Sequence, residues 1–331
     1  MRKVGSGNFK YEEICDWAKF PKGLLIPDVP GVAVDSQDRV FIFARTNPPV
    51  MVFDRGGRLL ATWGDGLFKR PHYICLGPDD SVYIVDDVGH AIHKFTPEGI
   101  LLMTIETASH PTDTGYVPVG AEGYAPGIPN IVKRAGPPFN TPTGVALSPT
   151  GELFVSDGYG NARVHKFTAD GKKLLLSWGE PGTGQGQFVQ PHGVWVDDTG
   201  RVYISDRQNA RIQIFDSQGA FLTQWDDVHF PDNICIDKNG NVYVAEVGCV
   251  WLRTLEPDLT KPPARITIRN LNGTIIAEWG EEKPYQEGMF FAPHGIAVDS
   301  RGDVYVSEVA KAYNRGKAPA DWPVLRKYVK C

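Results

Sequence analysis

Short runs of alternating apolar and polar residues, separated by turn residues, make up most of the chain. Residues 190–225 hold four such runs in succession, at 190–197, 201–206, 210–215 and 220–225. Alternation with a period of two is typical of β-strands that bury one face, and four of them joined by tight turns predict one antiparallel sheet. Gly and Pro recur at strand-length intervals along the chain, which argues against a helix-rich fold.

The first strand of this unit recurs along the chain, each time opened by a proline. Repeats of about 40 residues with four strands each are typical of a β-propeller, in which the sheets close radially and protect their edges. We therefore expect an all-β fold, a six-bladed β-propeller with four-stranded blades, forming one domain over residues 1–331. The six copies begin at Pro30, Pro71, Pro142, Pro191, Pro231 and Pro293.

The two ends of the chain complement each other in this scheme. The sixth repeat stops after its third strand, at 324–329, and a spare strand at 9–17 precedes the first repeat. We infer that the N-terminal strand completes blade six and closes the ring.

Residues 106–139 break the rhythm of the repeats. The segment is rich in Gly and Pro and shows no strand-like alternation, so we expect an insertion between blades two and three. Long loops in compact domains often serve as lids or binding loops. Tyr116, Tyr124, Lys133 and Arg134 are then candidates to approach a ligand, and a loop packed on the surface is the alternative.

Three Pro-His pairs open the predicted first strands of alternate repeats. His72, His192 and His294 fall in blades two, four and six. Since the first strand of a blade lines the central channel, alternate blades would aim three imidazoles at one axis, about 120° apart. Three facing imidazoles suit a four-coordinate metal with one open position. Zn²⁺ is the expected metal, with iron, cobalt or nickel as alternatives, and histidines with purely structural hydrogen bonds are the competing interpretation.

The ends of the second strands provide further chemistry. A second strand runs antiparallel to the first, so its end returns to the mouth where the histidines lie. Arg45, Tyr159 and Arg207 occupy such ends. Arginine suits an anionic substrate group and tyrosine suits proton transfer, which predicts an active site. Each of the three also has a structural alternative, in an ion pair, a loop cap or plain packing. The acidic residues at the same rim, which could orient the histidines, are Asp86, Asp87, Glu246 and Glu308.

Composition and charge narrow the classes of function. The 331 residues are 42% hydrophobic and 22% charged, as in an ordinary folded domain. The net charge of −5 is mixed along the chain, so we expect no nucleic-acid partner. No apolar stretch suits a secretory signal or a membrane-spanning helix, so we expect a cytoplasmic protein without a membrane partner. Five scattered cysteines predict buried free thiols rather than disulfides or a zinc cage.

Taken together, these residues resemble the peptidyl-α-hydroxyglycine α-amidating lyases, within the wider group of NHL-repeat six-bladed propellers. The resemblance spans nearly the whole chain and is strongest at 139–143, 156–163, 178–179, 186–188, 191–192 and 206–213. NHL-type repeats alone are weak evidence for the lyases, but the full set of histidines, tyrosine and arginines is more specific.

The resemblance implies a reaction and a role for each candidate residue. The family splits a carbinolamide at the bond between the hydroxyl-bearing carbon and nitrogen, releasing an amide and glyoxylate. It implies for this chain a small-molecule substrate, an N-acyl-α-hydroxyglycine or related amide, with an arginine holding a carboxylate. The family's zinc ligands match His72, His192 and His294, its active-site tyrosine matches Tyr159, and its two active-site arginines match Arg45 and Arg207.

Two departures from the family's pattern matter. A calcium site of the family resembles the surroundings of Val32 and Ile74, but its acidic ligand, directly after the third histidine, is here Gly295. The loss of that hard anionic oxygen argues against calcium. Secreted members of the family carry a cysteine directly after the tyrosine, whereas here Gly160 follows, which agrees with a reducing compartment.

Two other functions remain open from the sequence. A zinc-bound water at the same site also suits hydrolysis of a small amide or lactone. A non-enzymatic NHL propeller that binds a protein or RNA is the third interpretation, and the negative net charge argues against RNA. The sequence carries no prediction of the oligomeric state.

Overall fold

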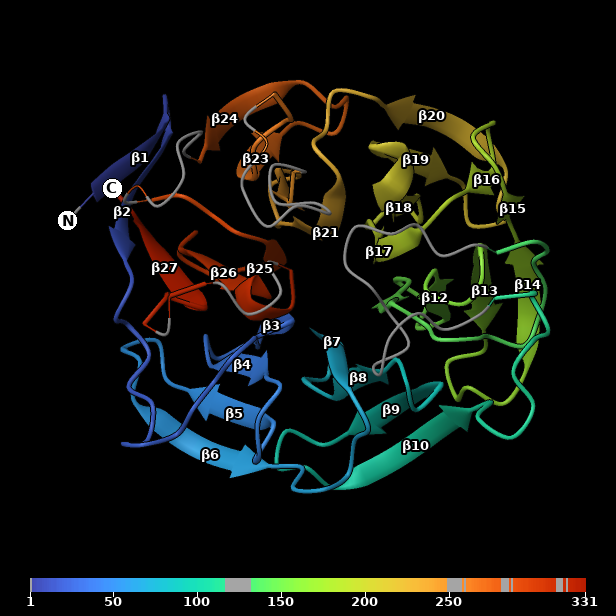
Figure 1. The fold of residues 1–331 in the computed structure, drawn as a ribbon, viewed down its shortest axis with the longest axis horizontal. Coiled ribbons are helices and arrows are strands. Elements are labelled where there is room, and N and C mark those ends of the chain that lie inside the picture. The colour runs from blue at the N-terminus through green and yellow to red at the C-terminus, as the bar shows by residue number, and fades with distance from the viewer. Residues whose placement is uncertain are drawn as a thin grey trace. The chain divides into compact units, whose positions relative to one another are not determined.

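The computed structural model describes residues 2–116, 132–248, 258, 260–280, 286, 288–313, 318–319 and 321–331. The regular secondary structure of these residues is β-strand apart from one short α-helix, α1 (Ala310–Tyr313), and one 3₁₀ turn, η1 (Arg207–Asn209). Neither is long and apolar enough to cross a membrane. Six antiparallel sheets recur along the chain, which confirms the expected all-β fold class, a six-bladed β-propeller (Figure 1).

The chain divides into two compact units. Residues 68–231, which we call the central unit, hold blades two, three and four. Blade two consists of β7 (Pro71–Leu76), β8 (Val82–Asp86), β9 (Ala91–Phe95) and β10 (Leu101–Glu106). Blade three consists of β11 (Gly144–Leu147), β12 (Leu153–Asp157), β13 (Arg163–Phe167) and β14 (Leu174–Trp178). Blade four consists of β17 (Pro191–Val196), β18 (Val202–Asp206), β19 (Arg211–Phe215) and β20 (Phe221–Trp225), preceded by the short parallel pair β15 (Glu180–Pro181) and β16 (Gln187–Phe188).

Residues 1–67 and 232–331, which we call the terminal unit, hold the other three blades. Blade one consists of β3 (Gly31–Val34), β4 (Val40–Phe43), β5 (Val50–Phe53) and β6 (Leu59–Trp63). Blade five consists of β21 (Pro231–Ile236), β22 (Val242–Glu246), β23 (Arg265–Arg269) and β24 (Ile275–Trp279). Blade six consists of β25 (Pro293–Val298), β26 (Val304–Glu308), β27 (Leu325–Lys330), β2 (Phe9–Ile14) and β1 (Arg2–Ser6).

Burial falls from the second strand of a blade to the fourth. Every residue of β8 and β12 is buried, whereas β10 alternates between exposed and half-buried residues. A strand covered on both faces favours continuous Val, Ile and Phe, which these second strands contain. First strands of neighbouring blades lie side by side, β7 beside β11 and β11 beside β17 in the central unit, and β25 beside β3 in the terminal unit. This arrangement brings the residues that open these strands close together within each unit.

An aspartate organises the turn between the first two strands of several blades. In blade four, Asp197 Oδ1 accepts hydrogen bonds from the backbone N–H groups of Thr199 and Arg201. Gly200 sits in the same turn at φ +84°, a left-handed conformation that glycine adopts without strain. Aspartate favours such turns because its short side chain bonds its own backbone two residues on. The tight turn predicted between the first two strands of this blade therefore has a local physical cause.

The N-terminal strand completes blade six, as expected. β2 pairs antiparallel with β27, and Glu13 lies opposite Tyr328. β1 pairs with β2 and adds a fifth strand, which the sequence analysis did not predict. Gly5 and Ser6 interrupt apolar alternation there, so the pattern of residues 2–6 carries little strand signal.

A buried ion cluster fastens the N-terminal strand to the end of the chain. Arg326 on β27 is 1% exposed and donates hydrogen bonds to Glu13 of β2 and to the carbonyl of Met289. Its Nη2 lies 3.0 Å from Oε1 of Glu308 on β26. The Tyr328 hydroxyl donates to the same Glu13 carboxylate at 3.1 Å. One guanidinium thus joins two buried carboxylates from strands far apart in the sequence.

The cysteines differ in part from the expectation. Cys15, Cys75, Cys235 and Cys331 are free thiols, and only Cys75 and Cys235 are buried. The prediction of buried thiols is wrong for Cys15 and Cys331, because they directly follow β2 and β27 near the outer edge of blade six. Cys249 lies outside the described residues.

We expect Arg326→Met to destabilise the protein by about 3–5 kcal/mol, because it leaves the Glu13 and Glu308 carboxylates buried without their shared cation. Chemical denaturation followed by tryptophan fluorescence measures the loss. Arg58→Met is the control, since the Arg58 side chain is 78% exposed in its pair with Asp54 and contributes about 0–1 kcal/mol. Equal losses in both variants would contradict a buried fastening of the N-terminal strand.

Candidate metal-binding and catalytic site

Each histidine of the Pro-His pairs lies at an irregularity in strand pairing. A β-bulge at this point turns a side chain out of the regular alternation of the strand. The preceding proline suits a bulge because it has no N–H to donate to the ladder. His72, His192 and His294 are all buried. The pairing register shifts between Pro71 and Tyr73, between Pro191 and Val194, and between Pro293 and Gly295.

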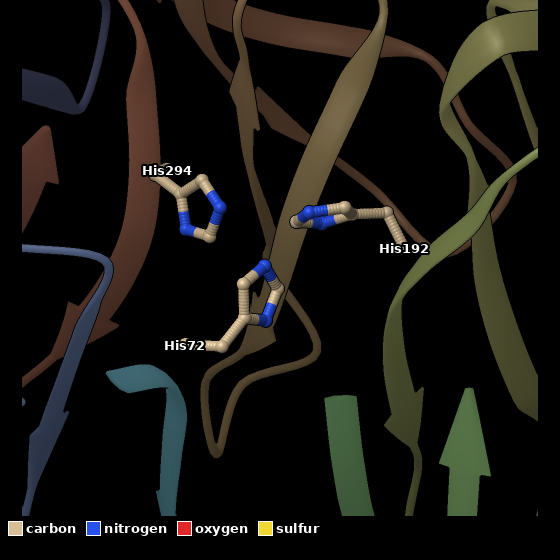
Figure 2. A group of neighbouring side chains, drawn as sticks. All are labelled: His72, His192 and His294. Atoms are coloured by element: carbon tan, nitrogen blue, oxygen red, sulfur yellow. The ribbon is translucent and has the colours of Figure 1, made fainter. Parts of the chain in front are cut away.

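The central unit brings His72, His192 and Tyr159 into contact. The Tyr159 hydroxyl oxygen lies 2.9 Å from Nε2 of His72 and 3.1 Å from Nε2 of His192. The two imidazole rings are 4.9 Å apart between centroids, and Figure 2 shows them turned toward each other. A ring nitrogen of one lies within 4.8 Å of a ring nitrogen of the other. A phenol and two imidazoles therefore form one buried cluster.

Backbone carbonyls set the orientation of two histidines. Nδ1 of His72 lies 2.8 Å from the carbonyl oxygen of Thr143, and Nδ1 of His294 lies 2.6 Å from that of Pro30. Because a carbonyl can only accept, Nδ1 carries the proton in both rings. The neutral ring then presents the lone pair of Nε2, the atom that in His72 accepts from Tyr159. Thr143 and Pro30 directly precede the first strands, β11 and β3, of the next blade, so the repeat itself supplies these acceptors.

A close approach of two strands positions Tyr159. It follows β12, whose last residue, Asp157, accepts hydrogen bonds from the backbone N–H of Asn140 and the side chain of Asn161. Burial raises the pKa of the Asp157 carboxyl, against the opposing effect of these hydrogen bonds. A Cβ at Gly158 would lie 2.0 Å from the carbonyl oxygen of Pro191. Only glycine lets the loop pack against the strand that carries His192.

Two guanidinium groups lie against the ring of Tyr159. Cζ of Arg207 is 5.7 Å and Cζ of Arg70 is 5.6 Å from the ring centroid, within the range of a cation–π contact. Gln190 Oε1 accepts from Nε and Nη2 of Arg207. Asp87 accepts from Nε of Arg70 at 2.8 Å and from Nη2 at 2.6 Å. The ring of Tyr159 therefore contacts a second arginine, Arg70, in addition to the predicted Arg207.

Arg70 and Gln190 were not singled out in the sequence, although a signal was present. Each stands two residues before a histidine of a Pro-His pair, Arg70 before His72 and Gln190 before His192. The bulge that turns the histidine inward gives the residue before the proline a place beside the same cluster. A sequence reading that stopped at the Pro-His pair missed this position.

In the terminal unit, His294 has an acidic neighbour. Nε2 of His294 lies 3.9 Å from Oδ2 of Asp232, which is fully buried. Asp232 opens blade five at the position that histidine occupies in blades two, four and six. A buried carboxylate at this distance favours a cation beside it.

Arg45 also lies in the terminal unit, at the end of blade one's second strand. Its Nη1 is 3.5 Å from Oδ2 of Asp28. Asp28 Oδ1 accepts from the backbone N–H groups of Lys311 and Ala312 in α1. Burial raises the pKa of the Asp28 carboxyl, and the charge of Arg45 opposes this effect.

The acidic residues expected at the rim of the channel bind arginine side chains and backbone N–H groups. Asp86 accepts from the backbone N–H of Arg70, and Asp87 pairs with its side chain. Glu246 pairs with Arg265, and Glu308 accepts from two backbone N–H groups and pairs with a guanidinium. The orienting role suggested for these acids is filled at His72 and His294 by backbone carbonyls instead.

The described ends of the predicted insertion contact the loop of Tyr159. Thr114 Oγ1 donates to the carbonyl of Gly160 at 2.6 Å, next to Tyr159 in the sequence. The backbone N–H of Tyr116 donates to Thr114 Oγ1. Among the candidates for ligand contact, Lys133 and Arg134 are exposed, Arg134 is paired with Asp113, and Tyr124 lies outside the described residues.

The position after the third histidine is closely packed. A Cβ at Gly295 would lie 2.4 Å from Oγ of Ser307 and 3.0 Å from the backbone nitrogen of Val32. An acidic side chain there requires the hydroxyl and the neighbouring strand to shift. The close packing around Gly295 therefore agrees with the absence of a carboxylate at this position.

The buried cluster of the central unit combines three chemical capacities. Imidazole Nε2 atoms suit a divalent transition metal, a phenol at hydrogen-bond distance suits proton transfer, and a guanidinium suits an anionic group. Three histidines of this chain are of the type that could hold a metal ion.

Comparison with known proteins identifies the repeats. The NHL repeat model matches residues 139–167 and 188–215, which include Tyr159 and His192. NHL repeat-containing protein 3 of Homo sapiens is 32% identical over 84% of this chain and 76% of its own length. The structure of a streptogramin B lyase covers 97% of both chains with a TM-score of 0.59 and 15% identity, a likeness that concerns the fold.

Amidating enzymes are similar over much of the chain. Peptidylglycine alpha-amidating monooxygenase of Rattus norvegicus is 30% identical over 92% of this chain, which spans 31% of that protein's length. Peptidyl-alpha-hydroxyglycine alpha-amidating lyase 1 of Drosophila melanogaster is 26% identical over 76% of this chain and 45% of its own length. The chain belongs to the NHL-repeat β-propeller family that includes NHL repeat-containing protein 3 and the peptidyl-α-hydroxyglycine α-amidating lyases.

Proposed function

We propose that the protein is a metal-dependent carbon–nitrogen lyase. It cleaves an N-acyl-α-hydroxyglycine or related carbinolamide to an amide and glyoxylate or a related aldehyde. The observation that carries the proposal is the buried Tyr159 hydroxyl between the Nε2 atoms of His72 and His192. A phenol placed there can exchange a proton with a substrate hydroxyl that lies beside the same imidazoles. Similarity to the Drosophila melanogaster amidating lyase supports this class of reaction.

In this proposal His294 joins His72 and His192 as the third ligand of a divalent cation, with Zn²⁺ as the expected metal. The donor chemistry fits: Nδ1 of His72 and of His294 is held by a carbonyl, which leaves Nε2 to bind the metal. All three imidazoles are buried and begin equivalent strands. The bound cation would act as a Lewis acid that acidifies the substrate hydroxyl. The packing at Gly295 argues against a second, calcium site beside it.

The residues of the chain share the remaining steps. In its phenolate form, Tyr159 accepts the proton of the substrate hydroxyl while the carbon–oxygen double bond forms and the carbon–nitrogen bond breaks. The same proton then returns to the nitrogen of the departing amide, so no external acid or base is consumed. Arg207, 2% exposed beside the Tyr159 ring, binds the substrate carboxylate. In this proposal, Arg45 makes a second contact with the substrate carboxylate.

His192→Ala tests the metal centre. We expect the wild-type protein to hold about one divalent transition metal per chain and the variant to lose it. The kcat of the variant should fall about 100-fold or more, because the loss of a metal ligand costs more than the 10- to 100-fold that follows from changing a residue that only orients a ligand. Elemental analysis and chromatography of the amide and glyoxylate are the measurements. His93→Ala is the control, because His93 bonds Thr104 on the outer strands of blade two.

Two results would overturn this assignment. Metal-replete protein that leaves α-hydroxyglycine amides intact excludes the lyase, and full metal content in His192→Ala excludes the site. Reaction in ¹⁸O-labelled water separates the lyase from an amide hydrolase at the same cluster. The lyase yields an unlabelled amide, whereas a hydrolase yields a carboxylic acid that carries the label.

Tyr159→Phe separates proton transfer from metal binding. We expect the variant to keep its metal and to lose about 10²- to 10⁴-fold in kcat, because the ring still packs while the hydroxyl is gone. Steady-state kinetics and elemental analysis of the same preparation measure both. Tyr203→Phe is a matched control, since the buried Tyr203 hydroxyl donates to Asp197 in the turn of blade four. An unchanged kcat in Tyr159→Phe would remove tyrosine from the reaction.

A further inference from the structure

The side chain of Gln190 is fixed against Arg207. Its Oε1 accepts hydrogen bonds from Nε of Arg207 at 3.2 Å and from Nη2 at 2.9 Å. The backbones are tied as well, because the Arg207 N–H donates to the Gln190 carbonyl at 3.0 Å. Both side chains are buried, Gln190 fully and Arg207 to 2% exposure. The two residues therefore form one rigid pair beside the Tyr159 ring.

These contacts decide which end of the amide is the donor. Guanidinium nitrogens only donate, so the Gln190 atom that receives them is the oxygen. The amide group Nε2 is then the outward donor of the pair. No described residue accepts a hydrogen bond from Nε2, although the atom is buried.

An amide N–H₂ buried without an acceptor is costly, about 1–3 kcal/mol. Gln213, a fully buried glutamine in the same blade, has both ends of its amide paired. Its Oε1 accepts from the backbone N–H of Gly186 at 2.9 Å, and its Nε2 donates to the carbonyl of Gln187 at 2.8 Å. Gln190 thus differs from Gln213 at its Nε2, which faces away from Arg207 and has no acceptor among the described residues.

We propose that Gln190 Nε2 and Arg207 together bind a carboxylate of the substrate, and that Gln190 makes the site select an anion over a neutral amide. The carboxylate supplies the acceptor that the buried amide lacks, and Arg207 supplies the charge. A neutral glutamine suits this task because it orients the guanidinium and does not itself cancel the positive charge of Arg207. Asp87, in contrast, pairs its negative charge with that of Arg70. The inference rests on the proposed function for the nature of the substrate.

Gln190→Glu tests the pair with ligands that are not cleaved. N-acetylglycine carries the carboxylate, and N-acetylglycinamide is its neutral counterpart. In calorimetric titrations of the metal-loaded protein, we expect the variant to bind N-acetylglycine about 10-fold or more weakly and to bind N-acetylglycinamide about as the wild type does. The new carboxylate repels the ligand anion, which weakens binding. It also pairs with Arg207, so the thermal midpoint of the Gln190→Glu variant should be unchanged or raised.

Two further variants keep the test independent of folding. Gln190→Met removes the amide without adding charge and should weaken N-acetylglycine binding about 10- to 150-fold, the measure of one lost hydrogen bond to an anion. Gln213→Glu is the matched control, which should lower the thermal midpoint and leave both affinities unchanged.

The outcomes separate this inference from the proposed function. Equal binding of N-acetylglycine by the wild type and Gln190→Glu, an equal loss of both ligands, or no binding of N-acetylglycine by the wild type would each overturn the inference. Selective loss of N-acetylglycine supports it. If selective loss occurs in a protein that releases no glyoxylate, the carboxylate site stands and the lyase reaction fails.

Discussion

Hydrogen bonds between neighbouring blades hold the cluster of the central unit together. Nδ1 of His72 donates to the Thr143 carbonyl at 2.8 Å, and the Thr143 hydroxyl donates to the Pro191 carbonyl at 2.8 Å. The Ser156 hydroxyl adds a bond of 2.7 Å to the carbonyl of His192. Blade three, which has threonine at the histidine position, thereby links the histidines of blades two and four. All of these groups are buried, where each hydrogen bond is electrostatically stronger than in water.

The same constraint explains where catalytic chemistry can be placed. Tyr159 reaches two histidines only because Gly158 lets its loop approach the carbonyl of Pro191. Its ring then lies against Arg70 and Arg207, two cations with different partners. Asp87 pairs with the charge of Arg70, whereas the contact of Gln190 with Arg207 is neutral. Two guanidinium groups at similar distances from one ring therefore suit different tasks, one structural and one for an anion.

The architecture could be predicted from the sequence because it depends on local repetition. Period-two alternation, turn residues and six copies of one opening strand specify four-stranded blades without reference to distant contacts. The completion of blade six by residues 9–14 followed from counting strands. The fifth strand, β1, did not follow, since residues 2–6 pair with β2 through the backbone and carry little pattern of their own. Burial of the cysteines was misjudged for Cys15 and Cys331, because a strand pattern does not show which blade edge meets solvent.

For the candidate site, the sequence by itself determined which residue types stand at the ends of the strands: three histidines in alternate blades, Tyr159, Arg45 and Arg207. Only the tertiary structure decided their partners. Whether an acid or a backbone carbonyl orients His72 depends on the approach of the next blade, and the answer is Thr143. Arg70 and Gln190 gained their places beside Tyr159 in the same way, through strands that meet only when the blades pack. Repetition along a chain encodes the blade, whereas the bulges and close contacts between blades set the distances on which chemistry depends.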